Sequence, residues 1–160
     1  MVNARSSSSS RFNVLLTQDR PHSEQHWTSQ LPRLLEPQGV ASYLVGTGQE
    51  AVDLAERMEF HAAVIDMSTP IGPEQLAAGA HGSGHDGFWV LEVLRRLPSN
   101  PPVVILRKPA FSQRQAERTL NDALRLGAFT VLKKPVDVEQ VLAVFRRLVD
   151  KRYRGAWPLG

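Results

Sequence analysis

The chain contains no cysteine among its 160 residues. Without cysteine it can form no disulfide, no thiolate metal site and no cysteine nucleophile, which is consistent with a reducing compartment. No apolar run approaches the ~20 residues that a membrane-spanning helix needs. The first ten residues, MVNARSSSSS, lack the apolar segment of a secretory signal, and their serine run predicts a disordered tail over residues 1–10. We therefore expect a cytoplasmic protein with no membrane partner.

The sequence also lacks a strong charge of either sign, because its formal net charge is only +3. A nucleic-acid-binding surface usually shows a basic stripe together with a readable motif. The densest basic cluster lies near the C-terminus and consists of Arg146, Arg147, Lys151, Arg152 and Arg154. Cations at the end of a helix also interact favourably with the helix dipole. We favour this second interpretation and expect no nucleic-acid partner.

What the sequence does contain is a strict alternation of short apolar runs and longer segments with helical periodicity. Such a pattern indicates a parallel sheet covered by helices on both faces. We predict one α/β domain with a flavodoxin-like (βα)5 fold, a three-layer sandwich whose five parallel strands have the order 2-1-3-4-5. The expected strands are residues 12–16, 41–45, 61–65, 103–106 and 129–132. The expected helices are residues 22–36, 49–58, 88–97, 112–126 and 138–152.

Three local features qualify this pattern. Pro32 lies inside the first predicted helix and is expected to kink or interrupt it. Asp137 is a plausible N-cap for the last helix. Residues 71–86 carry several glycines and no clear strand, and a connection of this length in a compact domain is usually functional or mobile. The predicted domain therefore covers residues 11–152 with a long loop at 71–86, and residues 153–160 form a C-terminal tail.

Polar residues follow four of the predicted strands. Asp19 follows the first, Asp66 the third, Arg107 the fourth and Lys134 the fifth. Because the carboxyl ends of parallel strands share one edge of the sheet, Asp19, Asp66 and Lys134 can converge. Two close carboxylates are costly unless a cation lies between them, and Mg²⁺ suits such a site because it takes a few carboxylate oxygens and leaves positions for phosphate. The lysine ammonium can hold a phosphoryl oxygen.

In these features the chain resembles the receiver domain of two-component response regulators, over roughly residues 12–149. The resemblance is carried by an acid after the first strand and by a strand-end aspartate with a proline four residues further on. It is also carried by an Asp-Gly pair that opens the third helix, a Gly-Ala pair before the fifth strand and a Lys-Pro pair after that strand. The residues are Asp19, Asp66, Pro70, Asp86–Gly87, Gly127–Ala128 and Lys134–Pro135. Each motif alone is weak, but their order and context make the set specific.

The resemblance implies a role for each site residue. Asp66 would accept a phosphoryl group from a partner histidine kinase or phosphotransfer protein. Asp19, Asp66 and the backbone carbonyl of Ser68 would bind Mg²⁺, and Lys134 would bind the phosphoryl oxygens. Such a protein is not an enzyme in the ordinary sense, since at most it catalyses its own phosphoryl transfer and dephosphorylation.

Three positions depart from the family pattern. Gln18 stands where the family usually has a second acid, which should weaken Mg²⁺ binding without abolishing it. Arg107 replaces the threonine or serine whose hydroxyl binds the phosphoryl group. Val131 replaces the aromatic residue that moves with this hydroxyl. Any conformational switch must therefore use another segment that can adopt two conformations, and the 71–86 loop is the obvious candidate.

Arg107 leaves two interpretations open. Its guanidinium could bind phosphate, or it could pair with Asp66 or Asp19 as an internal cation in place of the metal. The first interpretation gives an atypical phosphoaccepting receiver domain. The second gives a phosphorylation-independent interaction module with Arg107 filling the site. A flavodoxin-like enzyme is a weaker third hypothesis, because no nucleophile–base pair or cofactor motif supports it.

The sequence after Val149 offers no room for an output domain, which predicts a stand-alone receiver domain that signals through protein contacts. The expected contact surface is formed by the fourth helix, the fifth strand and the last helix. Arg114, Arg118 and Arg125 of the fourth helix are expected to be exposed there. The downstream target stays open, and a homodimer is one further partner to consider.

Overall fold

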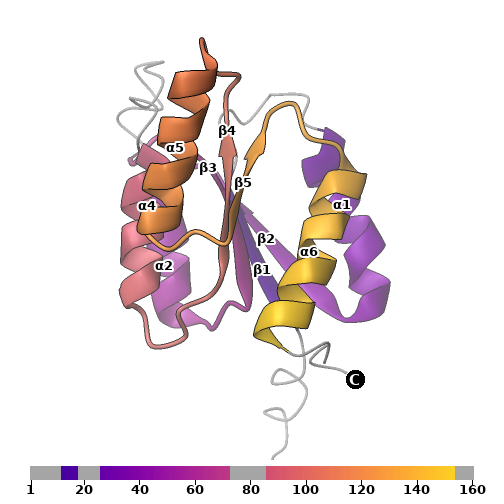
Figure 1. Cartoon of the computed structure of the whole chain (residues 1–160). Helices are drawn as coiled ribbons and strands as arrows, with labels where there is room; N and C mark the ends of the chain where they lie inside the picture. Colours follow the sequence, from indigo (N-terminus) through magenta and orange to yellow (C-terminus); the bar gives the residue numbers. More distant parts are fainter. Residues whose placement is uncertain (1–11, 18–25, 73–85, 154–160) are drawn as a thin grey trace, which may run out of the picture.

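The computed structural model describes residues 12–17, 26–72 and 86–153, and its centre is a sheet of five parallel strands (Figure 1). The strands are β1 (Phe12–Thr17), β2 (Val40–Val45), β3 (Ala62–Asp66), β4 (Val103–Arg107) and β5 (Thr130–Lys133). They lie in the order β2-β1-β3-β4-β5, and every neighbouring pair is parallel. The predicted fold class and strand order are therefore confirmed.

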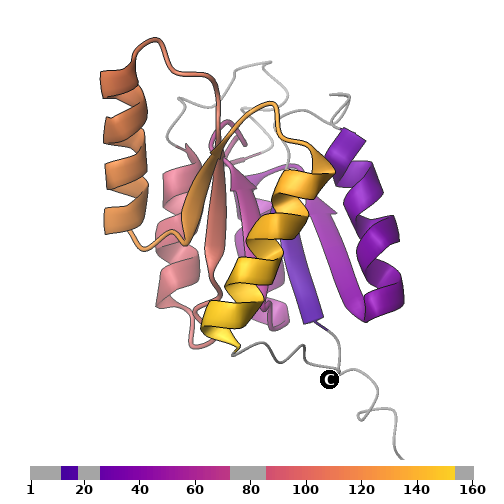
Figure 2. The same ribbon diagram turned by 45° about the vertical axis from the view of Figure 1, so that its right-hand side comes forward.

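Within these residues, α-helices cover both faces of the sheet, as Figures 1 and 2 show. On one face lie α1 (His26–Leu35) and α6 (Val138–Arg152). On the other face lie α2 (Gly48–Arg57), α4 (Asp86–Arg96) and α5 (Gln113–Arg125). The described helices include none with the length and apolar character needed to cross a membrane.

The strands separate the core into two layers because successive side chains point to opposite faces of a sheet. Along β3, Ala62 and Val64 pack toward α1 and α6, whereas Ala63 and Ile65 pack toward α2 and α4. All four are essentially fully buried. Burial on both faces explains why these strands appear in the sequence as continuous apolar runs.

The first helix differs from its prediction. It continues through Pro32 to Leu35, so the predicted interruption at this residue does not occur. Leu31 and Leu35, on either side of the proline, are buried in the core, and this packing holds the helix although one backbone donor is missing. The helix instead ends in a 3-10 turn, η1 (Glu36–Gln38), followed by Gly39 in a left-handed conformation with φ of 85°.

The last helix begins as predicted. Asp137 accepts a hydrogen bond from the Gln140 N–H, and the Gln140 side chain accepts one from the Asp137 N–H. This capping box satisfies two of the otherwise unpaired donors at the start of α6. The N-cap Asp137 lies only three residues after Lys134, which follows β5 at the carboxyl edge of the sheet.

The opposite edge of the sheet is closed by an aromatic cluster. The His61 ring stacks on Phe12 with 5.1 Å between centroids, and the Tyr153 hydroxyl donates to the His61 carbonyl at 2.6 Å. The His61 Nδ1 accepts from the Asn13 N–H. Burial lowers the pKa of His61, against a smaller opposing effect of Glu59, and burial raises the pKa of Tyr153. The hydrogen bond from Tyr153 to His61 ties the end of α6 to the sheet.

Candidate functional site

Asp66 is the last residue of β3, and its side chain is completely buried. Its Oδ1 accepts a hydrogen bond from the Ser68 N–H at 2.8 Å. Its Oδ2 lies 2.7 Å from the ammonium Nζ of Lys134. A buried carboxylate needs such partners because the interior does not replace the hydration that it loses. The structure thus brings Asp66 and Lys134 together across a sequence separation of 68 residues.

Lys134 is placed by the sheet and not only by its attraction to Asp66. It follows β5 directly, and its backbone N–H donates to the Arg107 carbonyl at 2.7 Å. Arg107 in turn ends β4, next to β3. The side chain of Lys134 is 15% exposed, so the ammonium lies at the rim of the site while the carboxylate lies below it. A partner approaching from solvent would therefore meet the Lys134 ammonium before the Asp66 carboxylate.

Thr17 is a site residue that the sequence analysis missed, because it lies one position beyond the predicted first strand, residues 12–16. It is instead the buried last residue of β1. Its Oγ1 accepts from the Asp66 N–H at 2.9 Å and from the Thr69 hydroxyl at 2.8 Å. The available signal was its β-branched side chain, which suits a strand even where the apolar run has ended.

The turn after Asp66 is held against α2. The Thr69 N–H donates to the Asp66 carbonyl, which closes the turn. The carbonyls of Pro70 and Ile71 accept from the N–H groups of Gly48 and Gln49, both at 2.8 Å. These bonds satisfy donors that the first turn of a helix leaves unpaired. The start of α2 and the turn that carries Ser68 are therefore one connected unit.

We expect Gly48→Ala to destabilise the fold by about 1–2 kcal/mol, through overpacking. A Cβ at this position would lie 2.9 Å from the Val90 Cγ2 and 3.3 Å from the Trp89 ring. Val90 is buried and β-branched, so it cannot turn away cheaply. Gly46→Ala is the matched control, because a Cβ there would meet nothing within 4 Å. Urea unfolding of both variants measures the difference, and equal stabilities would contradict this account of the α2–α4 contact.

Arg107 does not occupy the site as an internal cation of Asp66. Its Nη1 donates to the neighbouring Lys108 carbonyl at 3.0 Å, while Lys134 holds the Asp66 carboxylate. The described residues therefore contain no ion pair between Arg107 and Asp66. The Asp66 carboxylate already has a cation beside it, the Lys134 ammonium. Whether Arg107 approaches Asp19 lies outside the described residues.

Other predicted features are placed only in part. Val131 lies in β5 and packs, partly buried, in the core layer beneath α4 and α5. Gln18 and Asp19, most of the 71–86 loop and most of the C-terminal tail lie outside the described residues. So does the 1–10 segment. The boundaries proposed for the tails and the loop consequently stay predictions.

Two of the three predicted Mg²⁺ ligands can be compared with the structure. The Asp66 carboxylate and the Ser68 backbone are adjacent, and oxygen donors of this kind suit a hard cation. Asp19 would supply the second carboxylate. Across residues 12–17, 26–72 and 86–153 there is no group of three or more acidic, histidine or cysteine side chains that could hold a metal. The described part of the site fits Mg²⁺ only if further oxygen ligands come from Asp19, water or phosphate.

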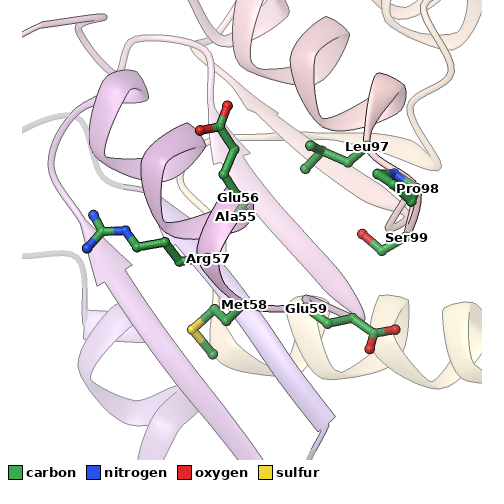
Figure 3. Close-up of a pocket in the computed structure, with 8 residues that line it drawn as sticks. All are labelled: Ala55, Glu56, Arg57, Met58, Glu59, Leu97, Pro98 and Ser99. Atoms are coloured by element: carbon green, nitrogen blue, oxygen red, sulfur yellow. The ribbon is translucent and has the colours of Figure 1, made fainter.

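A separate hollow lies at the opposite edge of the sheet, between the C-terminal ends of α2 and α4. It measures about 590 Å³ and is open to solvent. One side is lined by α2 and its C-terminal turn, with the charged residues Glu56, Arg57 and Glu59 (Figure 3). Leu97, Pro98 and Ser99 form the facing wall. The hollow shares no residue with the Asp66 site.

Comparison with solved structures gives a consistent class of neighbours. A CheY-like response regulator receiver domain protein from Methanospirillum hungatei is 18% identical, with a TM-score of 0.66 over 91% of this chain and 99% of that one. A Francisella response regulator receiver domain is 21% identical, with a TM-score of 0.64 over 89% and 99%. The receiver domain of a Pseudomonas aeruginosa sensor histidine kinase, described with magnesium coordinated in its active site cleft, is 22% identical, with a TM-score of 0.63 over 88% and 99%.

No protein-family model matches the sequence, and no curated protein matches it. The structural neighbours are receiver domains that cover nearly the whole chain, so the chain has the CheY-like receiver fold.

Proposed function

We propose that this chain is a receiver domain that accepts a phosphoryl group at Asp66 and signals through protein contacts. The observation that carries the proposal is the buried Asp66 carboxylate with the Lys134 ammonium 2.7 Å away, at the carboxyl edge of a receiver-type sheet. In open α/β sheets, ligands bind outside the carboxyl ends of the strands. The receiver fold of the neighbours supports a signalling domain over an enzyme with its own substrate.

The reaction would transfer a phosphoryl group from a phosphohistidine of a kinase or phosphotransfer protein. A carboxylate oxygen of Asp66 attacks phosphorus, the phosphorus–nitrogen bond breaks, and the leaving imidazole takes up a proton. The product is an acyl phosphate on Asp66. Catalysis of this kind depends on positioning and on neutralising charge at the phosphoryl oxygens. The Ser68 N–H positions the carboxylate, and Lys134 supplies a cation that can bind the transferred group.

Magnesium, when bound by Asp19, Asp66 and the Ser68 carbonyl, would neutralise further charge on the phosphoryl group. The magnesium ion of the Pseudomonas aeruginosa receiver domain supports this assignment for the fold. Removal of Mg²⁺ with a chelator should therefore slow phosphoryl uptake.

Intact-mass measurement after incubation with Mg²⁺ and acetyl phosphate tests the proposal. We expect the wild type to gain one phosphoryl group that hydroxylamine removes, and Asp66→Ala to gain none. Asp150→Ala, which removes an exposed carboxylate from α6, is the matched control and should still be modified. If no Asp66-dependent mass appears, with acetyl phosphate or with a cognate kinase, the phosphoacceptor function is wrong.

The second candidate is an interaction module that works without phosphorylation. It is favoured by the replacement of the usual switch residues by Arg107 and Val131, which cannot couple a hydroxyl to a moving ring. The structure gives no support to the version of this module in which Arg107 fills the site, because the Arg107 guanidinium donates to the Lys108 carbonyl. The mass experiment separates the two candidates, since only the first requires modification of Asp66.

A further inference from the structure

The hollow between the C-terminal ends of α2 and α4 has apolar residues in its wall (Figure 3). Ala55, Met58 and Leu97 line it, and all three are partly buried residues that pack against the core layer beneath α2 and α4. The hollow measures about 590 Å³, which lies within the range of about 300–1,000 Å³ that ligand pockets occupy. An apolar side chain that entered it would extend this core layer and lose contact with water.

The charged residues of the hollow include two carboxylates without a cation. Glu56 and Glu59 are exposed, and neither forms an ion pair with another residue that the structure describes. The cation beside them, Arg57, is bound within its own helix, because its Nε donates to the Asp53 carbonyl at 3.2 Å. In Figure 3 the Glu59 side chain extends toward the side of Ser99, whereas Arg57 extends away from that wall. A ligand that suits this hollow therefore combines an apolar group with positive charge.

The end of α6 is hydrogen-bonded next to both walls of the hollow. The Tyr153 hydroxyl donates at 2.6 Å to the carbonyl of His61, which follows the α2 wall in the chain. The Arg152 Nη2 donates at 3.1 Å to the carbonyl of Asn100, which directly follows Ser99 of the facing wall. The chain therefore leaves α6 beside the hollow.

Glu59 also acts electrostatically on the end of α6. Burial raises the pKa of Tyr153, Arg152 opposes this effect, and the Glu59 carboxylate adds to it. Such an effect requires that the carboxylate lies near the Tyr153 hydroxyl. The residue that follows Tyr153 in the sequence is a cation, Arg154.

The sequence that follows α6 has the composition that the hollow requires. Residues 154–160, Arg-Gly-Ala-Trp-Pro-Leu-Gly, lie outside the described residues. They contain one cation, two large apolar side chains, Trp157 and Leu159, and no acid. Four residues of extended chain span up to about 14 Å. Trp157, four residues after Tyr153, is therefore within reach of a hollow whose walls adjoin the hydrogen-bond partners of Tyr153 and Arg152.

We propose that the hollow is the docking site of this chain's own C-terminal segment, residues 154–160, with Trp157 against its apolar wall and Arg154 paired with Glu59. A tryptophan side chain gains more than most from burial, and its indole N–H can remain at a polar rim. The covalent connection through α6 gives the segment an effective concentration of order mM, so that a single anchoring side chain suffices. The docked segment would tie α6 to the ends of α2 and α4. This proposal does not depend on the phosphoacceptor role of Asp66.

Nuclear magnetic resonance of the full, isotope-labelled chain tests the proposal. In the wild type, nuclear Overhauser effects should connect the Trp157 indole to the side chains of Met58 and Leu97. Trp157→Ser should shift the amide resonances of Met58 and Leu97, because the ring current of the docked indole is lost, and should leave that of Ser68 in place. Phe111→Ser is the matched control, since it removes a 98% exposed aromatic side chain from the turn after β4 and should shift neither resonance of the hollow.

A charge exchange tests the pairing of Arg154 with Glu59. Arg154→Glu should lower the ratio of docked to undocked segment about threefold, the size expected for one exposed ion pair. Glu59→Arg should have a similar effect, and the two substitutions together should restore the wild-type ratio. Glu139→Arg, which reverses an exposed charge at the other end of α6, is the matched control and should leave the ratio unchanged.

The proposal is overturned if the wild type shows no contact between Trp157 and the hollow, or if Trp157→Ser leaves the resonances of Met58 and Leu97 unchanged. It is also overturned if these contacts disappear on dilution, because the segment of a second copy would then fill the hollow. Losses in Arg154→Glu and Glu59→Arg that the double variant does not restore would overturn the ion pair. None of these measurements involves Asp66, so their outcome is independent of the phosphoacceptor test.

Discussion

Lys134→Met should destabilise the folded chain by about 3 kcal/mol at neutral pH. The substitution keeps most of the side-chain volume but leaves the buried Asp66 carboxylate without its cation. Removal of one partner from a buried ion pair typically costs about 3–5 kcal/mol, because the remaining charge is desolvated and unpaired. The lower end applies here, since Lys134 is 15% exposed and water can approach the rim of the site. Urea unfolding followed by circular dichroism measures the loss.

A substitution of the other member of the ion pair, Asp66→Asn, separates the effect of charge from that of packing. Asp66→Asn should cost much less than Lys134→Met, because a partly exposed ammonium can turn to solvent. The double variant should recover most of the stability lost in Lys134→Met, since it no longer contains a buried charge. Lys133→Met is the matched control, because Lys133 is exposed and lies next to Lys134 in the chain. Additive losses in the double variant would rule out the pairing as the cause.

The fold and the Asp66–Lys134 pair could be predicted because both follow from the periodicity of the sequence. The buried runs on β3 and β4 lie next to each other with Asp66 beside Leu106, and the parallel order brings Lys134 to the same edge. The pairing of these two residues requires only that the carboxyl ends of parallel strands lie at the same edge of the sheet. No knowledge of side-chain conformation is needed, which is why Asp66 and Lys134 could be paired from sequence.

The remaining features depend on contacts that a sequence pattern does not contain. Thr17 is polar, and its burial follows from partners 49 and 52 residues away, Asp66 and Thr69. The Arg107 guanidinium donates to the carbonyl of the next residue, Lys108, and the sequence pattern does not specify such a bond. The continuation of α1 through Pro32 depends on burial of Leu31 and Leu35, which outweighs local propensity.

Thr17→Val should destabilise the fold by about 2–4 kcal/mol, although it preserves side-chain shape. The Thr17 Oγ1 is the acceptor for two buried donors, the Asp66 N–H and the Thr69 hydroxyl. Each buried donor left without a partner costs about 1–3 kcal/mol. Because one of these donors belongs to Asp66 itself, the substitution should also loosen the carboxylate and slow phosphoryl uptake. Chemical unfolding gives the first effect, and the rate of mass gain with acetyl phosphate gives the second.

Thr69→Val is the matched control for this network. It removes one hydroxyl, but Thr17 still accepts from the Asp66 N–H, so no backbone donor is orphaned. Its expected cost is about 1 kcal/mol, the net value of one ordinary hydrogen bond. Hydrogen exchange at the Asp66 amide supplies a local readout, because it should accelerate in Thr17→Val beyond the change in global stability and not in Thr69→Val. The account is contradicted if both variants lose the same stability and leave this amide equally protected. Thr17 would then contribute only core packing and would not position Asp66.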